Sequence, residues 1–245
     1  MSNKDWYVDW FNSHFYHQLY INRDDTEAER FIKNITEYLA LPKTSHILDI
    51  ACGRGRHSIS FNNLGFSVTG IDISEESIAY ANQYANDHLH FYVHDMRLPF
   101  WMNYFDVAVN LFTSFGYFRT VREDDAAIRT IAKSIKPGGL FVFDYLNVTN
   151  ASKKLQAESY KLINGTKFYI KRHQTDAHFY KEIKVVHPSL ETPLFHTEKV
   201  AKFTLSDFER MFEKQGLTIT QKFGNYNLDE FNEEESPRLI LIAKK

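Results

Sequence analysis

Two glycines in the first third of the chain have the spacing of a ligand-binding turn. Gly53 and Gly55 follow a short apolar run at residues 47–50, and a helical pattern resumes after them. Glycine is favoured where a backbone adopts positive φ or lets a ligand lie against it. The start of a helix also presents unpaired amide N–H groups, which attract electron-rich ligand atoms. The stretch therefore predicts a strand, a glycine turn and a helix start that bind a ligand.

An aspartate follows this turn at a second strand end. Asp72 closes the apolar run at residues 66–73, about 20 residues after the glycines. A carboxylate at such an edge can accept hydrogen bonds from both hydroxyls of a ribose. Asp72 could instead cap the next helix, but Ser74 can serve as that cap. We therefore predict that Asp72 binds a ribose, and we include its neighbour Ile73 in the same site.

The residues before and within the turn resemble a known signature. Asp49, Ala51, Gly53 and Gly55 resemble the acidic-x-Gly-x-Gly-x-Gly pattern of class I S-adenosylmethionine (SAM)-dependent methyltransferases, with Ala51 where the first glycine usually stands. This departure is mild if Ala51 has negative φ. The run from Gly53 to Ser58 also nearly fits half of a dinucleotide fingerprint, Gly-x-Gly-x-x-Gly/Ala. The choice between the two depends on residues downstream.

The resemblance implies further site residues at the next two strand ends. Asp95 would accept the exocyclic amine of adenine, and Met96 would lie on the ring face. Nicotinamide enzymes do not generally need such an aspartate, so Asp95 favours the methyltransferase. In a doubly wound sheet the ligand crevice lies outside the carboxyl ends of the strands, so residues 110–117 should face the transferable methyl group. The cofactor-site residues expected there are Asn110, Phe112 and Ser114.

The fold class implied by the resemblance is α/β: a Rossmann-like seven-stranded methyltransferase sheet with helices on both faces. Lys-Pro-Gly-Gly at 136–139 is frequent before the fifth strand of the family, and an antiparallel pair at 217–223 and 238–243 would close the sheet. Period-two alternation predicts strands between 145 and 203, with Asn164-Gly165 as a hairpin turn. We therefore expect two domains. Residues 1–147 and 204–245 would bind SAM, with 1–44 as a helical lid, and 148–203 would form an inserted antiparallel β subdomain that covers the substrate.

The segment at residues 6–21 is dense in aromatic side chains. Tyr16 and Tyr20 share a helical face at a spacing of four. The resemblance implies a lid over the cofactor, and packing at the domain edge is an equal alternative for these two tyrosines. Packing is favoured for Trp6, Trp10 and Phe11, and Tyr20 is included in the cofactor site. A helix capped by Asp24 or Asp25 should follow and end near Leu41.

The reaction implied is an in-line attack by an acceptor lone pair on the sulfonium methyl group of SAM, which leaves S-adenosyl-L-homocysteine (SAH). Positioning alone can supply about 7–11 kcal/mol of the barrier reduction, and a base is needed only if the nucleophile arrives protonated. No catalytic residue is assigned; the candidates are His57, Tyr16, Tyr20, Tyr117, Tyr145 and His178. The sequence has no Cys/His cluster, so we expect no metal. Cys52, within the turn, is expected to be a small packed residue.

Composition and charge limit the class of partner. The 245 residues are 43% hydrophobic and 24% charged, and 29 basic against 31 acidic side chains give a net charge of −2. No overall field therefore points to nucleic acid or to a membrane. No run approaches the ~18 apolar residues of a membrane span, and the N-terminus has no signal-peptide layout. With a single cysteine, these features predict a cytoplasmic protein.

The predicted insertion has a charge of its own. Residues 151–203 carry ten Lys or Arg against five acidic residues. They could cover an anionic acceptor, or lysines such as Lys167 and Lys171 could form the solvent face of the sheet, which we favour. The expected activity is methyl transfer to an N or O atom of a small-molecule acceptor. The alternatives are a tRNA or protein acceptor, a non-catalytic SAM-binding scaffold and, less favoured, a nicotinamide oxidoreductase. The sequence does not determine the acceptor or the oligomeric state.

Overall fold

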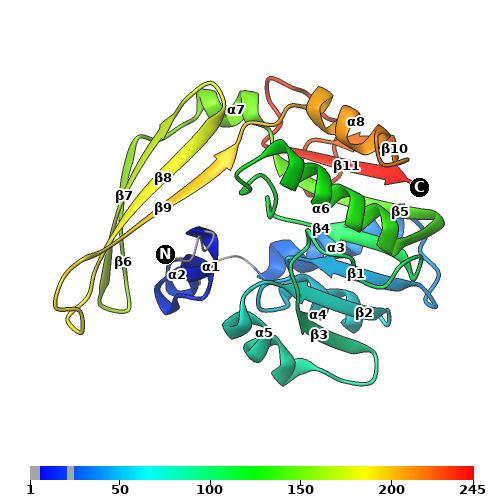
Figure 1. Ribbon diagram of the computed structural model, residues 1–245, viewed down its shortest axis with the longest axis horizontal. Coiled ribbons are helices and arrows are strands. Elements are labelled where there is room, and N and C mark those ends of the chain that lie inside the picture. The colour runs from blue at the N-terminus through cyan, green and yellow to red at the C-terminus, as the bar shows by residue number, and fades with distance from the viewer. Residues whose placement is uncertain (1–5, 21–24) are drawn as a thin grey trace.

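The computed structural model describes residues 6–20 and 25–245. Its larger sheet has seven strands in the order β10-β11-β5-β4-β1-β2-β3 (Figure 1). The first five strands along the chain run parallel to one another, and β11 is antiparallel to both β5 and β10. The strands are β1 (His46–Ile50), β2 (Ser67–Asp72), β3 (Leu89–Val93), β4 (Phe105–Asn110), β5 (Ile135–Leu146), β10 (Thr218–Phe223) and β11 (Arg238–Lys244). The predicted seven-stranded α/β fold is confirmed.

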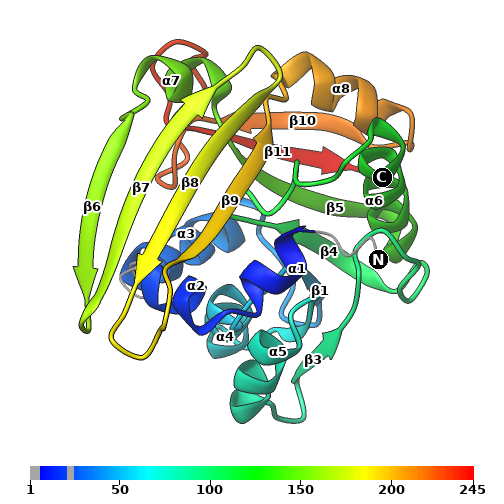
Figure 2. The ribbon, with the colours of Figure 1, turned by 60° about the vertical axis from the view of Figure 1, so that its left-hand side comes forward.

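Helices cover both faces of this sheet (Figures 1 and 2). On β4, Val107 and Val109 enter one apolar cluster whereas Ala108 enters the other, because successive strand residues point to opposite faces. The first cluster includes side chains of α3, α4 and α5, and the second includes side chains of α6 and α8. These elements are α3 (Asp25–Tyr38), α4 (Arg56–Asn63), α5 (Glu75–Ala81) with the 3₁₀ turn η1 (Asn82–Tyr84), α6 (Val121–Ser134) and α8 (Leu205–Glu213).

A second sheet of four antiparallel strands lies beside the first, in the order β6-β7-β8-β9 (Figure 2). It follows α7 (Val148–Lys153) and comprises β6 (Glu158–Ile163), β7 (Thr166–Gln174), β8 (His178–Val186) and β9 (Leu194–Ala201). On β7, Phe168 and Ile170 are buried while Lys167 and Lys171 are exposed, as the alternation predicts. Asn164 and Gly165 both have positive φ and form the predicted hairpin turn.

Two short helices at the N-terminal end pack on the second sheet. They are α1 (Trp6–Phe11) and α2 (His14–Leu19), and Figure 2 shows both in front of the carboxyl ends of the main sheet. Trp10 and Leu19 join Phe168 and Ile183 in an apolar cluster. The predicted cap Asp24, like residues 1–5 and 21–23 of the predicted lid, lies outside the described residues. The following helix ends at Tyr38, before the predicted end near Leu41.

The end of α5 and the start of β5 are each set by the local backbone. Helix α5 ends at Ala81 and continues directly into the 3₁₀ turn η1. The fifth strand begins at Ile135, before Lys-Pro-Gly-Gly, and its pairing with β4 shifts register there. Within the described ranges, no helix is long and apolar enough to cross a membrane.

Candidate functional site

The glycine turn joins β1 to α4 through residues with left-handed backbones. Gly55 has φ +84°, and a Cβ added there would lie 2.8 Å from Cζ of Phe91 on β3. Gly53 has φ +56°, and a Cβ there would meet no protein atom within 4 Å. The space beside Gly53 is therefore open, and Gly53 lines a cavity. Glycine is required at position 55 by close packing, whereas position 53 leaves room for a ligand.

Ala51 has a positive φ, so its departure from the glycine of the signature is not a mild one. Its φ is +57°, in the left-handed region that disfavours a Cβ. The strain at this position therefore explains physically why the signature has glycine there. Cys52 is buried, and burial raises the pKa of its thiol, so it lines the cavity as a neutral small residue.

Replacing Ala51 with glycine should stabilise the protein. Relief of the left-handed strain is partly offset by the extra entropy of the unfolded chain, so we expect Ala51→Gly to raise the free energy of unfolding by up to about 1 kcal/mol. Urea unfolding would measure this change. The control is Ala151→Gly within α7, which should lower the free energy of unfolding by about 0.5–1 kcal/mol. If both variants were destabilised equally, the left-handed backbone at Ala51 would not lower the free energy of unfolding.

Asp72 connects the end of β2 to the glycine turn. Its Oδ2 accepts a hydrogen bond of 2.8 Å from the N–H of Gly53, and its Oδ1 accepts one of 2.8 Å from the N–H of Ser74. Ser74 caps α5 by accepting from the N–H of Ser77, as predicted. Asp72 is buried, burial raises its pKa, and it lines the cavity. A carboxylate has about four lone-pair sites, so two protein bonds leave room for ligand hydroxyls.

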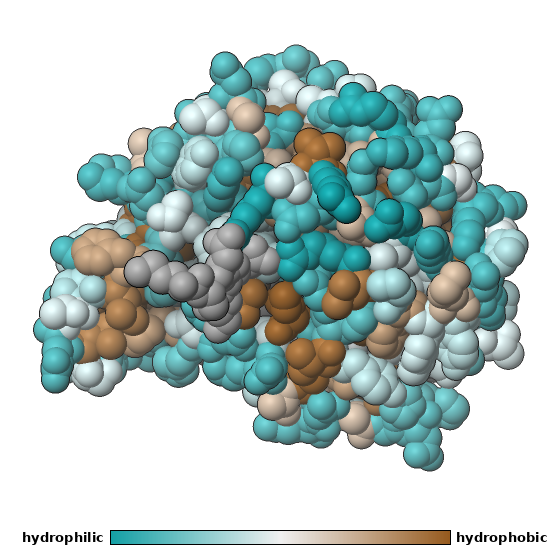
Figure 3. All heavy atoms as spheres, in the orientation of Figure 1, coloured by the Kyte–Doolittle hydropathy of each residue, from teal (hydrophilic) through white to brown (hydrophobic). Residues whose placement is uncertain are grey.

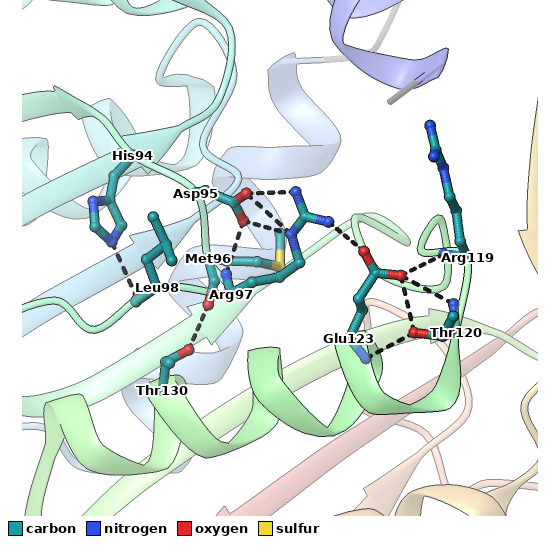
Figure 4. A network of polar contacts seen from close by, with 9 residues as sticks. All are labelled: His94, Asp95, Met96, Arg97, Leu98, Arg119, Thr120, Glu123 and Thr130. Atoms are coloured by element: carbon teal, nitrogen blue, oxygen red, sulfur yellow. Dashed lines mark hydrogen bonds and ion pairs between the residues drawn. The ribbon is translucent and has the colours of Figure 1, made fainter. Parts of the chain in front are cut away.

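Asp95 lies at the end of β3 in an ion pair that the sequence reasoning missed (Figure 4). Arg97 donates to both carboxylate oxygens through Nε at 3.1 and 3.0 Å, and its Nη1 donates to Glu123 at 2.7 Å. Glu123 completes a capping box with Thr120 at the start of α6. Burial would raise the pKa of Asp95, but the bonds and charge of Arg97 hold it below its usual value. The spacing Asp95-x-Arg97 was the only available signal for this pair.

The cavity has a volume of about 590 Å³, within the range of small-molecule sites. It lies at the carboxyl ends of β1, β2, β3 and β4, where ligands bind in open α/β sheets. In Figure 3 the outline of the molecule is indented between the second sheet and α5, below α1 and α2. The predicted site residues that line the cavity are Tyr16, Tyr20, Ala51, Gly53, His57, Asp72, Ile73, Asp95, Met96, Phe112, Ser114 and Tyr117.

Five predicted site residues are not among the described lining residues, namely Asp49, Gly55, Asn110, Tyr145 and His178. Tyr145 is fully buried, its hydroxyl donates to the carbonyl of Ala201 at 2.6 Å, and burial raises its pKa well above the usual value. Asn110 is buried and donates to the carbonyl of Ile50 at 3.0 Å. His178 lies on β8.

The two N-terminal helices form the wall opposite the glycine turn. The cavity is lined there by Tyr7, Phe11, Tyr16 and Tyr20. Phe11 was expected only to pack at the domain edge, so its place in the cavity lining is an additional role. Trp10 packs on the second sheet. The ring centroids of Phe11 and Tyr117 lie 5.5 Å apart, which continues the aromatic wall into the loop after β4. We call Tyr7, Phe11, Tyr16 and Tyr117 the aromatic wall.

Polar contacts hold these helices on both sides of the cavity. Asn12 accepts through Oδ1 from the hydroxyl of Ser74 at 2.9 Å, at the start of α5. On the other side, Glu198 of β9 accepts from the indole N–H of Trp10 at 2.8 Å and from the hydroxyl of Tyr20 at 2.8 Å. None of the described lining residues belongs to 148–203. The second sheet therefore supports the aromatic wall from behind, and its lysines do not reach the cavity.

The comparisons with known proteins agree with this geometry. Residues 47–139 match the family described as a methyltransferase domain. The dTDP-3-amino-3,4,6-trideoxy-alpha-D-glucopyranose N,N-dimethyltransferase of Streptomyces venezuelae is 32% identical over 103 residues, which are 42% of this chain and 43% of that protein. The glycine N-methyltransferase of Rattus norvegicus is 27% identical over 147 residues, or 53% and 50% of the two chains. The chain thus spans about half the length of the curated relatives it matches.

Solved structures share the whole fold. A S-adenosylmethionine-dependent methyltransferase from Clostridium acetobutylicum superposes with a TM-score of 0.78 at 18% identity, over 94% of this chain and 96% of its own. DesVI from Streptomyces venezuelae superposes with a TM-score of 0.69 at 21% identity, over 93% and 95%. The sequence match covers the glycine turn and the ends of β2 and β3, and the structural match covers both sheets. Residues 47–139 therefore match a methyltransferase domain, and the whole chain has the fold of solved SAM-dependent methyltransferases.

Proposed function

We propose that this protein is a SAM-dependent methyltransferase that transfers a methyl group to a nitrogen atom of a small-molecule acceptor. The observation that carries the proposal is one cavity with two unlike walls. Asp72, Asp95 and the glycine turn form a polar wall, and the aromatic wall faces it. The first wall suits a nucleoside, and the second suits a cationic or apolar group.

The residues of the polar wall fit SAM. Asp72 would hold the ribose hydroxyls, Asp95 and Met96 would hold the adenine, and the open space beside Gly53 would admit the backbone of the methionyl group. When bound, SAM supplies an electrophilic methyl group on a sulfonium. Asp72 presents a buried carboxylate already oriented by two backbone N–H groups, so little side-chain entropy is lost when a ligand binds.

The protein's own contribution to the reaction is positioning and exclusion of water. Tyr117 lines the cavity, and its hydroxyl donates to the carbonyl of Thr113 at 2.8 Å. A phenol oxygen that accepts from an amine N–H would orient the nitrogen lone pair towards the methyl group. A neutral amine needs no base to attack, and its nitrogen becomes cationic as the bond to carbon forms. Aromatic faces stabilise such a cation by about 0.5–2 kcal/mol. This is why the aromatic wall favours nitrogen over oxygen as the acceptor atom.

The comparisons support the same acceptor class. The names of two sequence relatives specify N-methylation, of an amino sugar nucleotide in one and of glycine in the other. A solved neighbour, KedS8 from Streptoalloteichus, is described as a sugar N-methyltransferase. The lysines of the second sheet do not line the cavity, which argues against an anionic or nucleic-acid acceptor held by that sheet. An amino sugar or another small amine is therefore the first acceptor class to test.

Calorimetry and methyl transfer test this proposal in turn. We expect micromolar binding of SAM and SAH and no binding of NAD. With methyl-labelled SAM, small amines and amino sugars should be labelled, whereas the matched compounds with a hydroxyl in place of the amine should not. Binding of NAD without SAH would overturn the cofactor assignment. Labelling of the hydroxyl compounds alone would overturn the nitrogen assignment.

A further inference from the structure

The turn that follows β4 has an unusual backbone. Phe112 and Thr113 are consecutive non-glycine residues with φ of +62° and +59°. Left-handed residues with a Cβ are disfavoured, and two in succession persist only where the surroundings hold them. Phe112 and Ser114 of this turn line the cavity. The strained segment is thus part of the wall at which methyl transfer is proposed.

A buried aspartate on the neighbouring strand holds this backbone. Asp144 of β5 is 1% exposed, and its Oδ2 accepts from the N–H of Phe112 at 2.7 Å. Its backbone carbonyl accepts from the N–H of Thr113 at 3.0 Å. One residue therefore binds both strained amides, with its side chain on the first and its main chain on the second.

The aspartate is in turn held by the last strand of the chain. Arg238 of β11 donates through Nε to Oδ1 of Asp144 at 2.7 Å, and through Nη2 to Oγ1 of Thr113 at 2.8 Å. The hydroxyl of Tyr226 donates to Oδ2 of Asp144 at 3.0 Å. Because a guanidinium is a rigid fork, Arg238 fixes the aspartate and the turn relative to one another.

The ring of Phe112 connects this network to the glycine turn. The guanidinium of Arg56, at the start of α4, lies 5.2 Å from the ring centroid of Phe112, and that of Arg238 lies 5.8 Å from it. Arg56 also lines the cavity. The ring of Phe112 is therefore near two cations, one beside the glycine turn and one in the buried network.

We propose that Asp144 and Arg238 are positioning residues that hold the left-handed turn at Phe112 and Thr113, and so set the wall of the cofactor cavity. Neither residue lines the cavity, so they act through the turn. The part of this inference that concerns ligand binding rests on the proposed function. The part that concerns the backbone of the turn does not, and the two can be tested separately.

Hydrogen exchange tests the backbone part. In Asp144→Asn, peptides that cover residues 110–118 should exchange at least tenfold faster than in the wild type, while peptides of β1 and β2 are unchanged. The matched control is Asp106→Asn, because Asp106 also accepts a backbone N–H, from His46 at 2.8 Å, and pairs with a cation, Lys136, at 2.7 Å. Unaltered exchange of 110–118 in Asp144→Asn would overturn the inference.

Binding of SAH with a glycine rescue tests the ligand part. Asp144→Asn should weaken SAH binding about tenfold, and adding Thr113→Gly should recover at least threefold, because glycine adopts positive φ without the support. Ala40→Gly, at another left-handed residue, should recover nothing. A simple loss of stability would not be rescued by glycine at one position only, so absence of rescue would overturn the positioning role.

Two further variants keep the test informative if Asp144→Asn does not fold. Asp144→Asn with Arg238→Met removes both buried charges together, which avoids leaving an unpaired guanidinium. Tyr226→Phe removes one bond only and should accelerate exchange of 110–118 less than the double variant does. If SAH bound neither the wild type nor any variant, the proposed function would fail, and hydrogen exchange alone would decide the positioning inference.

Discussion

Asp72→Ala should bind SAH about 10²–10⁴-fold more weakly than the wild type. The carboxylate is buried, lines the cavity and is oriented by the N–H groups of Gly53 and Ser74. Hydrogen bonds to a charged group contribute about 1.5–3 kcal/mol each. Loss of two ribose hydroxyl bonds therefore costs about 3–6 kcal/mol, and each 1.4 kcal/mol is tenfold in affinity. Isothermal titration calorimetry of both proteins measures the difference.

The assignment to the ribose is tested by changing the ligand as well as the protein. A 2′-deoxy analogue of SAH should bind the wild type more weakly than SAH does, but should lose little further affinity in Asp72→Ala. Asp106→Ala is the control, since Asp106 supports a backbone N–H at the opposite end of the sheet. If Asp72→Ala stayed folded and bound SAH as tightly as the wild type, the ribose assignment would be wrong.

The parts of the fold that could be predicted from sequence are those set by local patterns. The strand at His46–Ile50 has an apolar run and the glycines follow directly, so the turn is encoded within about ten residues. The hairpin at Asn164-Gly165 is encoded by two residues with a known turn preference. Asp72 was identifiable for the same reason, because the end of a buried strand shows in the pattern of hydrophobic residues.

The residues that could not be predicted interact across long separations in sequence. Arg238 and Thr113 are 125 residues apart, and Trp10 and Glu198 are 188 apart. No periodicity links such pairs, and only the packed sheets bring them together. For this reason the support of the aromatic wall by β9, and that of the left-handed turn by β11, emerged only from the structure.

The positive φ of three residues could not be predicted from the sequence either. Ala51, Phe112 and Thr113 all have positive φ, although none is glycine. Residue type gave no indication of strain at these positions, because their neighbours in space provide the stabilisation. Tyr145 shows the same difficulty for side chains. It lies near the carboxyl end of β5, where a cavity-lining role was expected, yet its hydroxyl donates to the carbonyl of Ala201 within the protein.

The stability of the protein should fall as pH rises from about 4 to 7, and Asp49→Asn should remove a large part of this fall. Asp49 is 1% exposed and burial raises its pKa to about 7, although its Oδ2 accepts from the hydroxyl of Ser58 at 2.6 Å. Between these pH values the folded protein retains a proton that the unfolded chain has released. Stability therefore decreases through this range and levels off above pH 7. The cost of ionising Asp49 is on the order of 4 kcal/mol.

Urea unfolding at pH 4.5 and pH 8 would measure this effect. The wild type should lose several kcal/mol of stability between the two values, and Asp49→Asn should lose about 3–4 kcal/mol less. Asp124→Asn is the matched control for a second carboxyl, because burial also raises the pKa of Asp124 to about 7 but its side chain lies on α6, outside the cavity lining. It should reduce the pH dependence similarly and leave SAH binding unchanged.

Working above pH 4.5 avoids titrating Asp95, whose pKa is held low by Arg97 and whose contribution has the opposite sign. An equal loss of stability in Asp49→Asn and the wild type would mean that Asp49 is ionised at neutral pH despite its burial.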